Sequence, residues 1–279
     1  MFPQILHQTW KTKNTLPANF RHWRESFPAL NPDFDIRLYD DADNRALLAH
    51  TFPQLLPLYD GFPQEIFRVD FIRAVYLFTE GGIYADLDFQ CLKPLSELPA
   101  NSSQVILGRM GTDPAFLHSI PNAFMASAAG QGFWLGYICA IENVRELTRG
   151  HAHIDKRPEY VAGPVVLRRV ARAYQRNRDA FRAETLAFVR KHAFDIDPDT
   201  IAFGELALLP GHVLYPINWK DKLHRQFLTR MNRDESWLSV EEARRYFPTS
   251  NAVTYWANSW QAPQGPPELP TGAHLSHTP

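Results

Sequence analysis

The sequence has little cysteine, no long apolar run and no excess of charge of either sign. Cys91 and Cys139 form neither a CxxC pair nor a set that could cross-link a small secreted domain, so we expect two buried free thiols. No uninterrupted apolar stretch approaches the ~18 residues of a membrane span. Residues 1–10 show no basic leader followed by an apolar segment. The expected location is therefore cytoplasmic.

The balance of charge excludes a general electrostatic partner. Lys and Arg number 29 against 30 Asp and Glu, so the formal charge of -1 offers no overall attraction to nucleic acid or to anionic lipid. Any charged partner must be bound locally. With 279 residues, 45% of them hydrophobic, the chain can build a substantial packed core. We expect one domain with a helical annex over 1–262, followed by a flexible Pro- and Gly-rich tail over 263–279.

Apolar periodicity predicts alternating strands and helices. The expected strands lie at 4–10, 34–39, 83–90 and 104–107 and near Ala207 and Val213, and the expected helices at 19–26, 43–50, 65–80, 133–147 and 165–175. The segment 40–43 is rich in aspartate, which suits the cap of the helix that follows better than it suits catalysis. The alternation indicates an α/β sheet flanked by helices.

A pair of aspartates stands out at the end of the strand expected at 83–90. Side chains alternate between the faces of a strand, so Asp86 and Asp88 share one face while Leu87 points to the other. Two adjacent carboxylates repel each other in an apolar setting unless a cation neutralises them, and oxygen ligands suit Mg²⁺ or Mn²⁺. The pair therefore predicts a divalent metal site.

The alternative is that both aspartates simply end the strand and point into solvent, which is the usual meaning of a DxD sequence on its own. Their position favours the metal site. They follow a buried helix, the Gly81-Gly82 break and an apolar strand, so they lie at the carboxyl end of a sheet strand, where open α/β folds bind their ligands.

Further charges lie on the otherwise apolar helix expected at 65–80. Asp70 and Arg73 are three residues apart, with Arg68 nearby, and charged side chains are rarely buried without partners. One interpretation is a structural ion pair. The other is that Asp70 contacts a hydroxyl of a ligand while Arg73 orients it or meets a phosphate oxygen.

Several of these stretches together resemble a known family. They are PQILHQTWK at 3–11, RVDFIR at 68–73 and GGIYADLD at 81–88, with weaker similarities at 122–126, 163–164 and 256–260. The chain resembles the DXD-containing glycosyltransferases of family 32, which include yeast initiating α-1,6-mannosyltransferases, sphingolipid mannosyltransferases and bacterial polysaccharide enzymes. The anchors extend from residue 3 to residue 260, so the similarity covers nearly the whole chain ahead of the tail.

The resemblance implies a GT-A type fold and a metal-dependent hexosyltransferase that retains the donor's anomeric configuration. The implied cofactor is Mn²⁺ or Mg²⁺, and the implied partners are a nucleotide-sugar donor, such as GDP-mannose or a UDP-hexose, and a glycan or lipid-linked acceptor. The catalytic residues would be Asp70, Arg73, Asp86 and Asp88. The metal would be bound by Asp86, Asp88 and Asn258. Further donor contacts would come from His7, Gln8, Thr9, Trp10, Arg68, Gly82, Tyr84, Asn258, Ser259 and Trp260.

One position departs from the family pattern. Many relatives have a histidine near the closing stretch, where this chain has Thr254, which puts one metal or phosphate contact in doubt. Asn258 or Ser259 would supply an oxygen ligand instead, while the alternative is that Trp256 and Trp260 are ordinary core aromatics.

Other interpretations stay open at this point. Arg168, Arg172 and Arg176 recur every fourth residue and predict a solvated basic face, or else a peripheral contact with the inner face of an anionic membrane. A metal-dependent phosphohydrolase would also use paired aspartates, although with more ligands grouped near Asp86 than this sequence shows. A non-catalytic relative that binds sugar nucleotides is the third function class.

Overall fold

The computed structural model describes residues 2–99, 102, 104–113, 115–150, 156–234 and 237–257. Across these residues the main sheet has six strands in the order β2-β1-β3-β6-β5-β7. Their bounds are β1 Ile5–Thr9, β2 Asp35–Tyr39, β3 Gly82–Ala85, β5 Val105–Gly108, β6 Phe124–Ser127 and β7 Leu206–Leu209. β1 is parallel to β2 and β3, β6 is antiparallel to β3 and β5, and β7 is parallel to β5. The mixed α/β sheet is as predicted.

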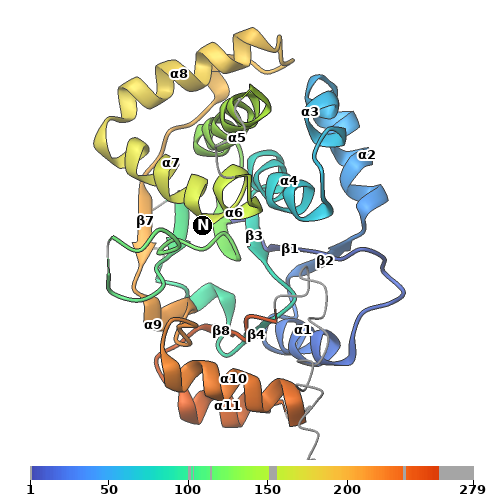
Figure 1. Ribbon diagram of the computed structural model, residues 1–279, viewed down its shortest axis with the longest axis vertical. Coiled ribbons are helices and arrows are strands. Elements are labelled where there is room, and N and C mark those ends of the chain that lie inside the picture. The colour runs from blue at the N-terminus through green and yellow to red at the C-terminus, as the bar shows by residue number, and fades with distance from the viewer. Residues whose placement is uncertain are drawn as a thin grey trace, which may run out of the picture.

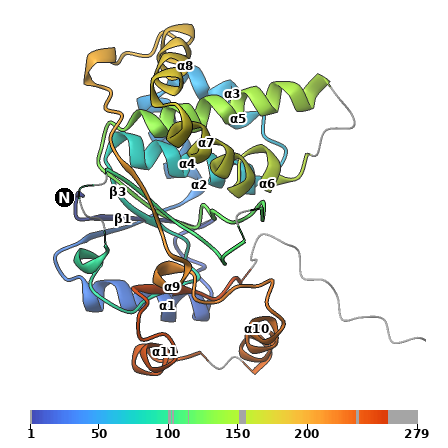
Figure 2. The same ribbon diagram turned by 90° about the vertical axis from the view of Figure 1, so that its left-hand side faces the viewer.

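Helices cover both faces of this sheet (Figures 1 and 2). One face carries α2 Asp41–Thr51, α4 Glu65–Thr79, α5 Gly132–Gly150, α7 Pro164–Arg176 and α8 Arg178–Lys191. The short helices α3 Leu56–Asp60 and α6 Pro158–Val161 lie beside them. The other face carries α1 Ala18–Leu30 and α9 Gly211–Leu214. Below these lie α10 Lys222–Asp234 and α11 Val240–Tyr246 (Figure 2). A second sheet of β4 Phe89–Cys91 and β8 Ala252–Thr254 packs beside α1 and α9.

The central helix α4 forms where the sequence predicts it. Ten of its side chains are buried, so it packs on nearly all sides against the sheet and against α5. It ends at Thr79, and Gly81 and Gly82 then take φ values of +68° and +89°, a region that favours glycine. A Cβ on Gly82 would lie 2.5 Å from the Ile5 carbonyl oxygen, so only glycine lets β3 lie beside β1 here.

The aspartates at 40–43 form a cap, as expected. The Asp40 side chain accepts the Asp43 backbone N–H at 3.0 Å, and the Asp43 side chain accepts the Asp40 N–H at 2.9 Å. Both cysteines are free and buried, also as expected.

The prediction of one strand over 83–90 is wrong. β3 ends at Ala85 and β4 begins at Phe89, with a turn between them. The Asp86 N–H still donates to the carbonyl of Ala123, the residue before β6, at 2.8 Å, but the Phe89 N–H donates back to the Asp86 carbonyl at 3.1 Å. The chain leaves the main sheet at this point because β4 pairs with β8. The two aspartates therefore lie in a turn and do not share the face of one strand.

Two further expectations are corrected. Val213 lies in α9 and not in a strand, because the turn after Pro210 closes into a helix whose Tyr215 N–H returns to the Gly211 carbonyl. The basic stripe on α7 is not one solvated face, since Arg168 is 6% exposed and its Nε donates to the Ser119 hydroxyl at 3.2 Å.

Two further expectations concern membrane-spanning segments and the boundary between the domain and its tail. No helix among the described residues is long and apolar enough to cross a membrane. The expected boundary between domain and tail, at 262–263, lies outside the described residues.

Candidate active site

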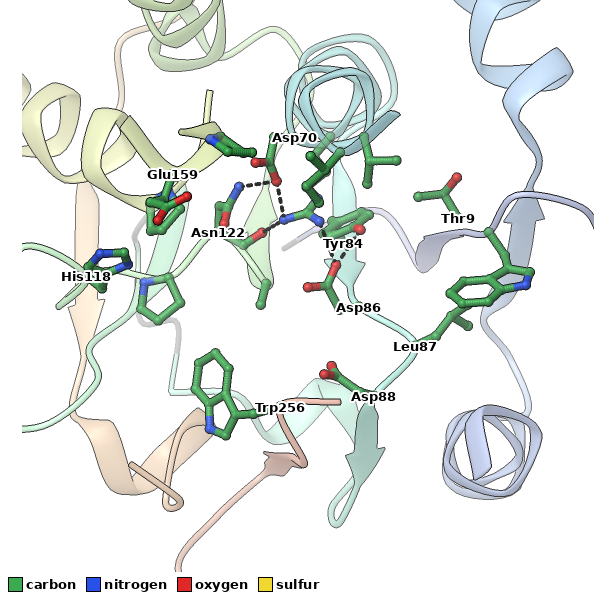
Figure 3. A pocket seen from close by; sticks show the side chains of 18 of the residues that line it. Thr9, Asp70, Tyr84, Asp86, Leu87, Asp88, His118, Asn122, Glu159 and Trp256 are labelled. Carbon is green, nitrogen blue, oxygen red and sulfur yellow. Dashed lines mark hydrogen bonds and ion pairs between the residues drawn. The ribbon is translucent and has the colours of Figure 1, made fainter. Parts of the chain in front are cut away.

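A cavity of about 650 Å³ opens at the carboxyl ends of the parallel strands β1 and β3. Its lining residues come from α4 and α6 on one side and from α10 on the other. Figure 2 shows α4 and α6 above the strands and α10 below them. This is the edge at which open α/β folds bind ligands, and the volume suits a small organic molecule. Figure 3 shows Asp86 and Asp88 reaching into the cavity from opposite sides.

Asp86 is bound from the helical side of the cavity. Its Oδ1 accepts the Tyr84 hydroxyl at 2.6 Å and pairs with an Arg73 guanidinium nitrogen at 3.0 Å. Its side chain remains 29% exposed toward the cavity. Burial raises the pKa of this carboxyl, and Arg73 and Tyr84 oppose the increase. Asp86 is therefore held in one orientation while part of the carboxylate stays open to a ligand.

Asp88 is bound from the side of the second sheet. Its Oδ1 accepts the Thr254 hydroxyl at 3.2 Å, and its Oδ2 accepts the Ala257 backbone N–H at 2.9 Å. Burial, together with the nearby Asp86 carboxylate, raises the pKa of Asp88 to about 7. Thr254 thus orients a carboxylate that has no cationic side chain within pairing distance among the described residues.

Arg73 connects the site to the core. Its side chain is 5% exposed, and it pairs with Asp70 at 3.1 Å and with Asp86 at 3.0 Å. It also donates to the Asn122 carbonyl at 2.9 Å and lies over the Tyr84 ring, 4.8 Å from the centroid. These contacts occupy both terminal nitrogens of Arg73. The geometry therefore favours a role for Arg73 in orienting Asp70 and Asp86, and it disfavours a direct contact between Arg73 and a phosphate.

Asp70 lies in the wall of the same cavity. Its Oδ1 accepts from the Asn122 amide at 2.8 Å and from Arg73. The second carboxylate oxygen of Asp70, Oδ2, lies beside Gly163. A Cβ at position 163 would lie 3.1 Å from this oxygen, so the glycine leaves space next to it. Burial raises the pKa of Asp70 to about 6, against the effect of Arg73 and Asn122. The second oxygen is thus available to a ligand hydroxyl.

The other residues expected at the site fall into three groups. Thr9, Trp10 and Tyr84 line the cavity. His7, Gln8, Arg68 and Gly82 do not line it, and Asn258, Ser259 and Trp260 lie outside the described residues.

Of the residues off the cavity wall, His7 and Arg68 have polar partners elsewhere, whereas the Gln8 amide has none among the described residues. His7 is buried against Tyr76 and donates its Nε2–H to the Gly81 carbonyl at 2.9 Å. Burial lowers the pKa of His7 to about 4. Arg68 pairs with Glu65 and not with Asp70. Gln8 is fully buried, and its amide has no hydrogen-bond partner among the described residues.

The sequence analysis missed one side of the cavity. His118, Glu159 and Trp219 line it, as does α10 through Arg225. No periodic apolar pattern marks these segments, and the loops that carry His118 and Trp219 are joined only by the fold. The hydrogen bond between Asn122 and Asp70 could not be predicted from the sequence either, because 52 residues separate the two side chains.

The residues present fit a divalent ion that a ligand helps to coordinate. No group of three or more His, Cys, Asp or Glu side chains suited to a metal occurs in the described part of the chain. Mg²⁺ sites that also bind substrate phosphates typically use only one or two carboxylates. Asp86 and Asp88, which face one cavity and have raised pKa values, supply that number.

Comparison with known proteins agrees with this geometry. Residues 17–105 match the model of a family described as the glycosyltransferase sugar-binding region containing the DXD motif. Over these residues the chain is similar to the DXD-containing glycosyltransferases. The matched region ends beyond Asp88 and includes α4 and the turn that carries both aspartates.

Curated relatives in this family are similar over part of the chain. Inositol phosphoceramide mannosyltransferase 3 of Schizosaccharomyces pombe is 32% identical over 181 residues, which are 64% of this chain and 47% of the relative. The initiation-specific alpha-1,6-mannosyltransferase of Candida albicans is 29% identical over 38% of this chain and 29% of its own. The chain spans less than half the length of these relatives.

A solved structure, PaToxG Glycosyltransferase, superposes with a TM-score of 0.47 at 19% identity, over 71% of this chain and 82% of its own. The mixed sheet flanked by helices agrees with the GT-A type fold expected for the family.

Proposed function

We propose that this protein is a retaining, metal-dependent hexosyltransferase that moves a sugar, with mannose as the first candidate, from a nucleotide-sugar to an acceptor hydroxyl. The observation that carries the proposal is the pair Asp86 and Asp88, which face one cavity at the carboxyl ends of β1 and β3 beside the buried Asp70 and Arg73. Mannose leads because the relatives cited above are named as mannosyltransferases.

Asp86 and Asp88 would hold the divalent ion, Mn²⁺ or Mg²⁺. When bound, such an ion supplies positive charge to a diphosphate that gains negative charge as it leaves the sugar. Arg73 and Tyr84 fix the orientation of Asp86, and Thr254 with the Ala257 N–H fixes that of Asp88. These fixed contacts lower the cost of assembling the site.

Asp70 would hold the donor sugar. One of its oxygens is bound by Asn122 and Arg73, and the other is open to accept a sugar hydroxyl. Arg73 favours the ionised form of the Asp70 carboxylate and fixes its orientation, so a sugar hydroxyl would meet it from one direction. Thr9 and Trp10, on the β1 side of the cavity, would contact the nucleotide. Retention by front-side attack is carried over from the family and forms part of the proposal.

A panel of donors tests the function. GDP-mannose, UDP-galactose, UDP-glucose and UDP-N-acetylhexosamine are each incubated with the protein and Mn²⁺, and release of the nucleotide is measured with and without a glycan or lipid-linked acceptor. We expect one donor to release its nucleotide and NMR of the product to show the donor's anomeric configuration. Release from none of them would contradict the proposal, and product of inverted configuration would contradict retention. The cytoplasmic location and a peripheral membrane contact remain predictions that this assay does not address.

A further inference from the structure

The side of the cavity opposite Thr9 has an aromatic wall. His118 stacks on Phe116 with 5.6 Å between ring centroids, and it meets the edges of Trp219 at 5.9 Å and Tyr160 at 6.4 Å. Trp219 in turn meets Phe116 at 5.5 Å. His118 and Trp219 line the cavity and are half-buried, so one part of each ring is packed and another part faces the open space.

Polar groups accompany this wall. The Glu159 carboxylate, from α6, lines the same region with its side chain 21% exposed, and the nearest Arg157 nitrogen lies 3.7 Å away. The ring nitrogens of His118 have no hydrogen-bond partner among the described residues. Burial lowers the pKa of His118, so its neutral ring can both donate and accept at pH 7. Figure 3 shows His118 and Glu159 on one side of the two aspartates and Thr9 on the other.

The location separates this wall from the expected donor site. The nucleotide belongs at the carboxyl ends of the parallel strands, where Thr9 and Trp10 lie, and the donor sugar belongs beside Asp70. His118 and Trp219 come instead from the loop after β5 and from the segment between α9 and α10. The remaining space beyond the metal centre is where a second substrate would enter.

We propose that His118, Trp219 and Glu159 form the acceptor subsite and that it binds a neutral sugar ring. This inference rests on the proposed function and names the acceptor class for the same cavity. An aromatic face suits the C–H face of a pyranose, and a carboxylate with a neutral imidazole suits its hydroxyls. Charges of both signs lie at this wall, since Arg157 is 3.7 Å from Glu159 and the Lys220 ammonium lies over the Phe116 ring at 4.0 Å, so it is the aromatic rings that favour a saccharide.

Binding of simple glycosides tests the subsite without any turnover. Methyl α-mannoside, methyl α-galactoside and methyl β-glucoside serve as probes, and saturation-transfer NMR detects those whose ring protons contact the full-length protein. We expect at least one probe to bind and its signal to fall by about fivefold or more in Trp219→Ala and in His118→Ala. The control variant is Tyr246→Ala, whose ring is 66% exposed on α11, and it should keep the full signal.

Asp88→Asn separates this inference from the proposed function. It should lose nucleotide release yet keep the glycoside signal, because the acceptor wall does not include Asp88. Absence of binding by all three probes, or a signal that survives in both Trp219→Ala and His118→Ala, would overturn the subsite. A signal that disappears in Asp88→Asn but not in the wall variants would place the sugar at the donor centre and overturn it as well. The thermal midpoint of each variant shows that it is folded.

Discussion

Replacing Arg73 with leucine tests the buried charge cluster that connects the site to the core. The substitution leaves the carboxylates of Asp70 and Asp86 without their shared cation, in positions where side-chain exposure is only 7% and 29%. Removing one partner of a buried ion pair costs ~3–5 kcal/mol, a large part of typical domain stability. For a chain of this size, we expect the thermal midpoint to fall by about 6–20 °C.

Arg68→Leu is the matched control, since Arg68 lies on the same helix and pairs with a half-exposed Glu65. It should cost less than about 1 kcal/mol. Differential scanning calorimetry of both variants at pH 7 gives the comparison. A thermal midpoint of Arg73→Leu within about 2 °C of wild type would show that the ion pairs of Arg73 with Asp70 and Asp86 do not stabilise the fold.

Asp70→Asn then separates structure from function, because it keeps the shape of the side chain and a partner for Asn122. Loss of the open carboxylate oxygen should lower donor cleavage by about a hundredfold or more. The loss of stability should be smaller than in Arg73→Leu. Near-normal cleavage by the folded variant would restrict Asp70 and Arg73 to a structural ion pair.

Two predictions concern the core behind the site. The folded-state pKa of His7 is about 4, below its ordinary 6.5, so stability is lost as pH falls from 6.5 toward 4; between pH 7 and 5 the loss should reach about 2 kcal/mol. Urea titrations should show that the free energy of unfolding depends less steeply on pH in His7→Phe than in wild type. An unchanged pH dependence would show that His7 is not the group responsible. Gly82→Ala should destabilise by at least ~2 kcal/mol, through positive φ and a 2.5 Å contact with Ile5. Gly130→Ala, with φ +70° but its nearest atom at 3.8 Å, should cost about half as much, and equal losses would rule out the steric reason.

The sequence predicted the elements whose signals are local. The buried helix α4 shows nearly continuous apolar residues, and α2 has its aspartate cap, so both lie within a few residues of the expected bounds. β1 and β5 were also predicted, because each is a short stretch rich in apolar residues. The helices α8, α10 and α11 were not, because α8 and α10 are strongly polar and α11 is short. Polar helices are stabilised by packing that a single sequence does not display.

The candidate site was predictable where its residues are close in sequence. Asp86 and Asp88 were found from their spacing, although the strand alternation used to pair them is wrong, because the chain turns between them to reach β8. Contacts across the sequence could not be derived. The hydrogen bond from Thr254 to Asp88 joins residues 166 positions apart. The wall of His118 and Trp219 likewise depends on two loops that meet only in the folded protein.

The role of the two aspartates is tested most directly by nucleotide release from the best donor, measured for wild type and Asp88→Asn at matched Mn²⁺ concentrations and after EDTA. We expect wild type to release nucleotide with Mn²⁺, to stop in EDTA and to recover when Mn²⁺ is restored. We expect folded Asp88→Asn to be slower by about a hundredfold, or ~3 kcal/mol in the transition state. Wild-type rates from folded Asp88→Asn, or release that continues unchanged in EDTA, would contradict a metal-dependent transferase centred on Asp86 and Asp88.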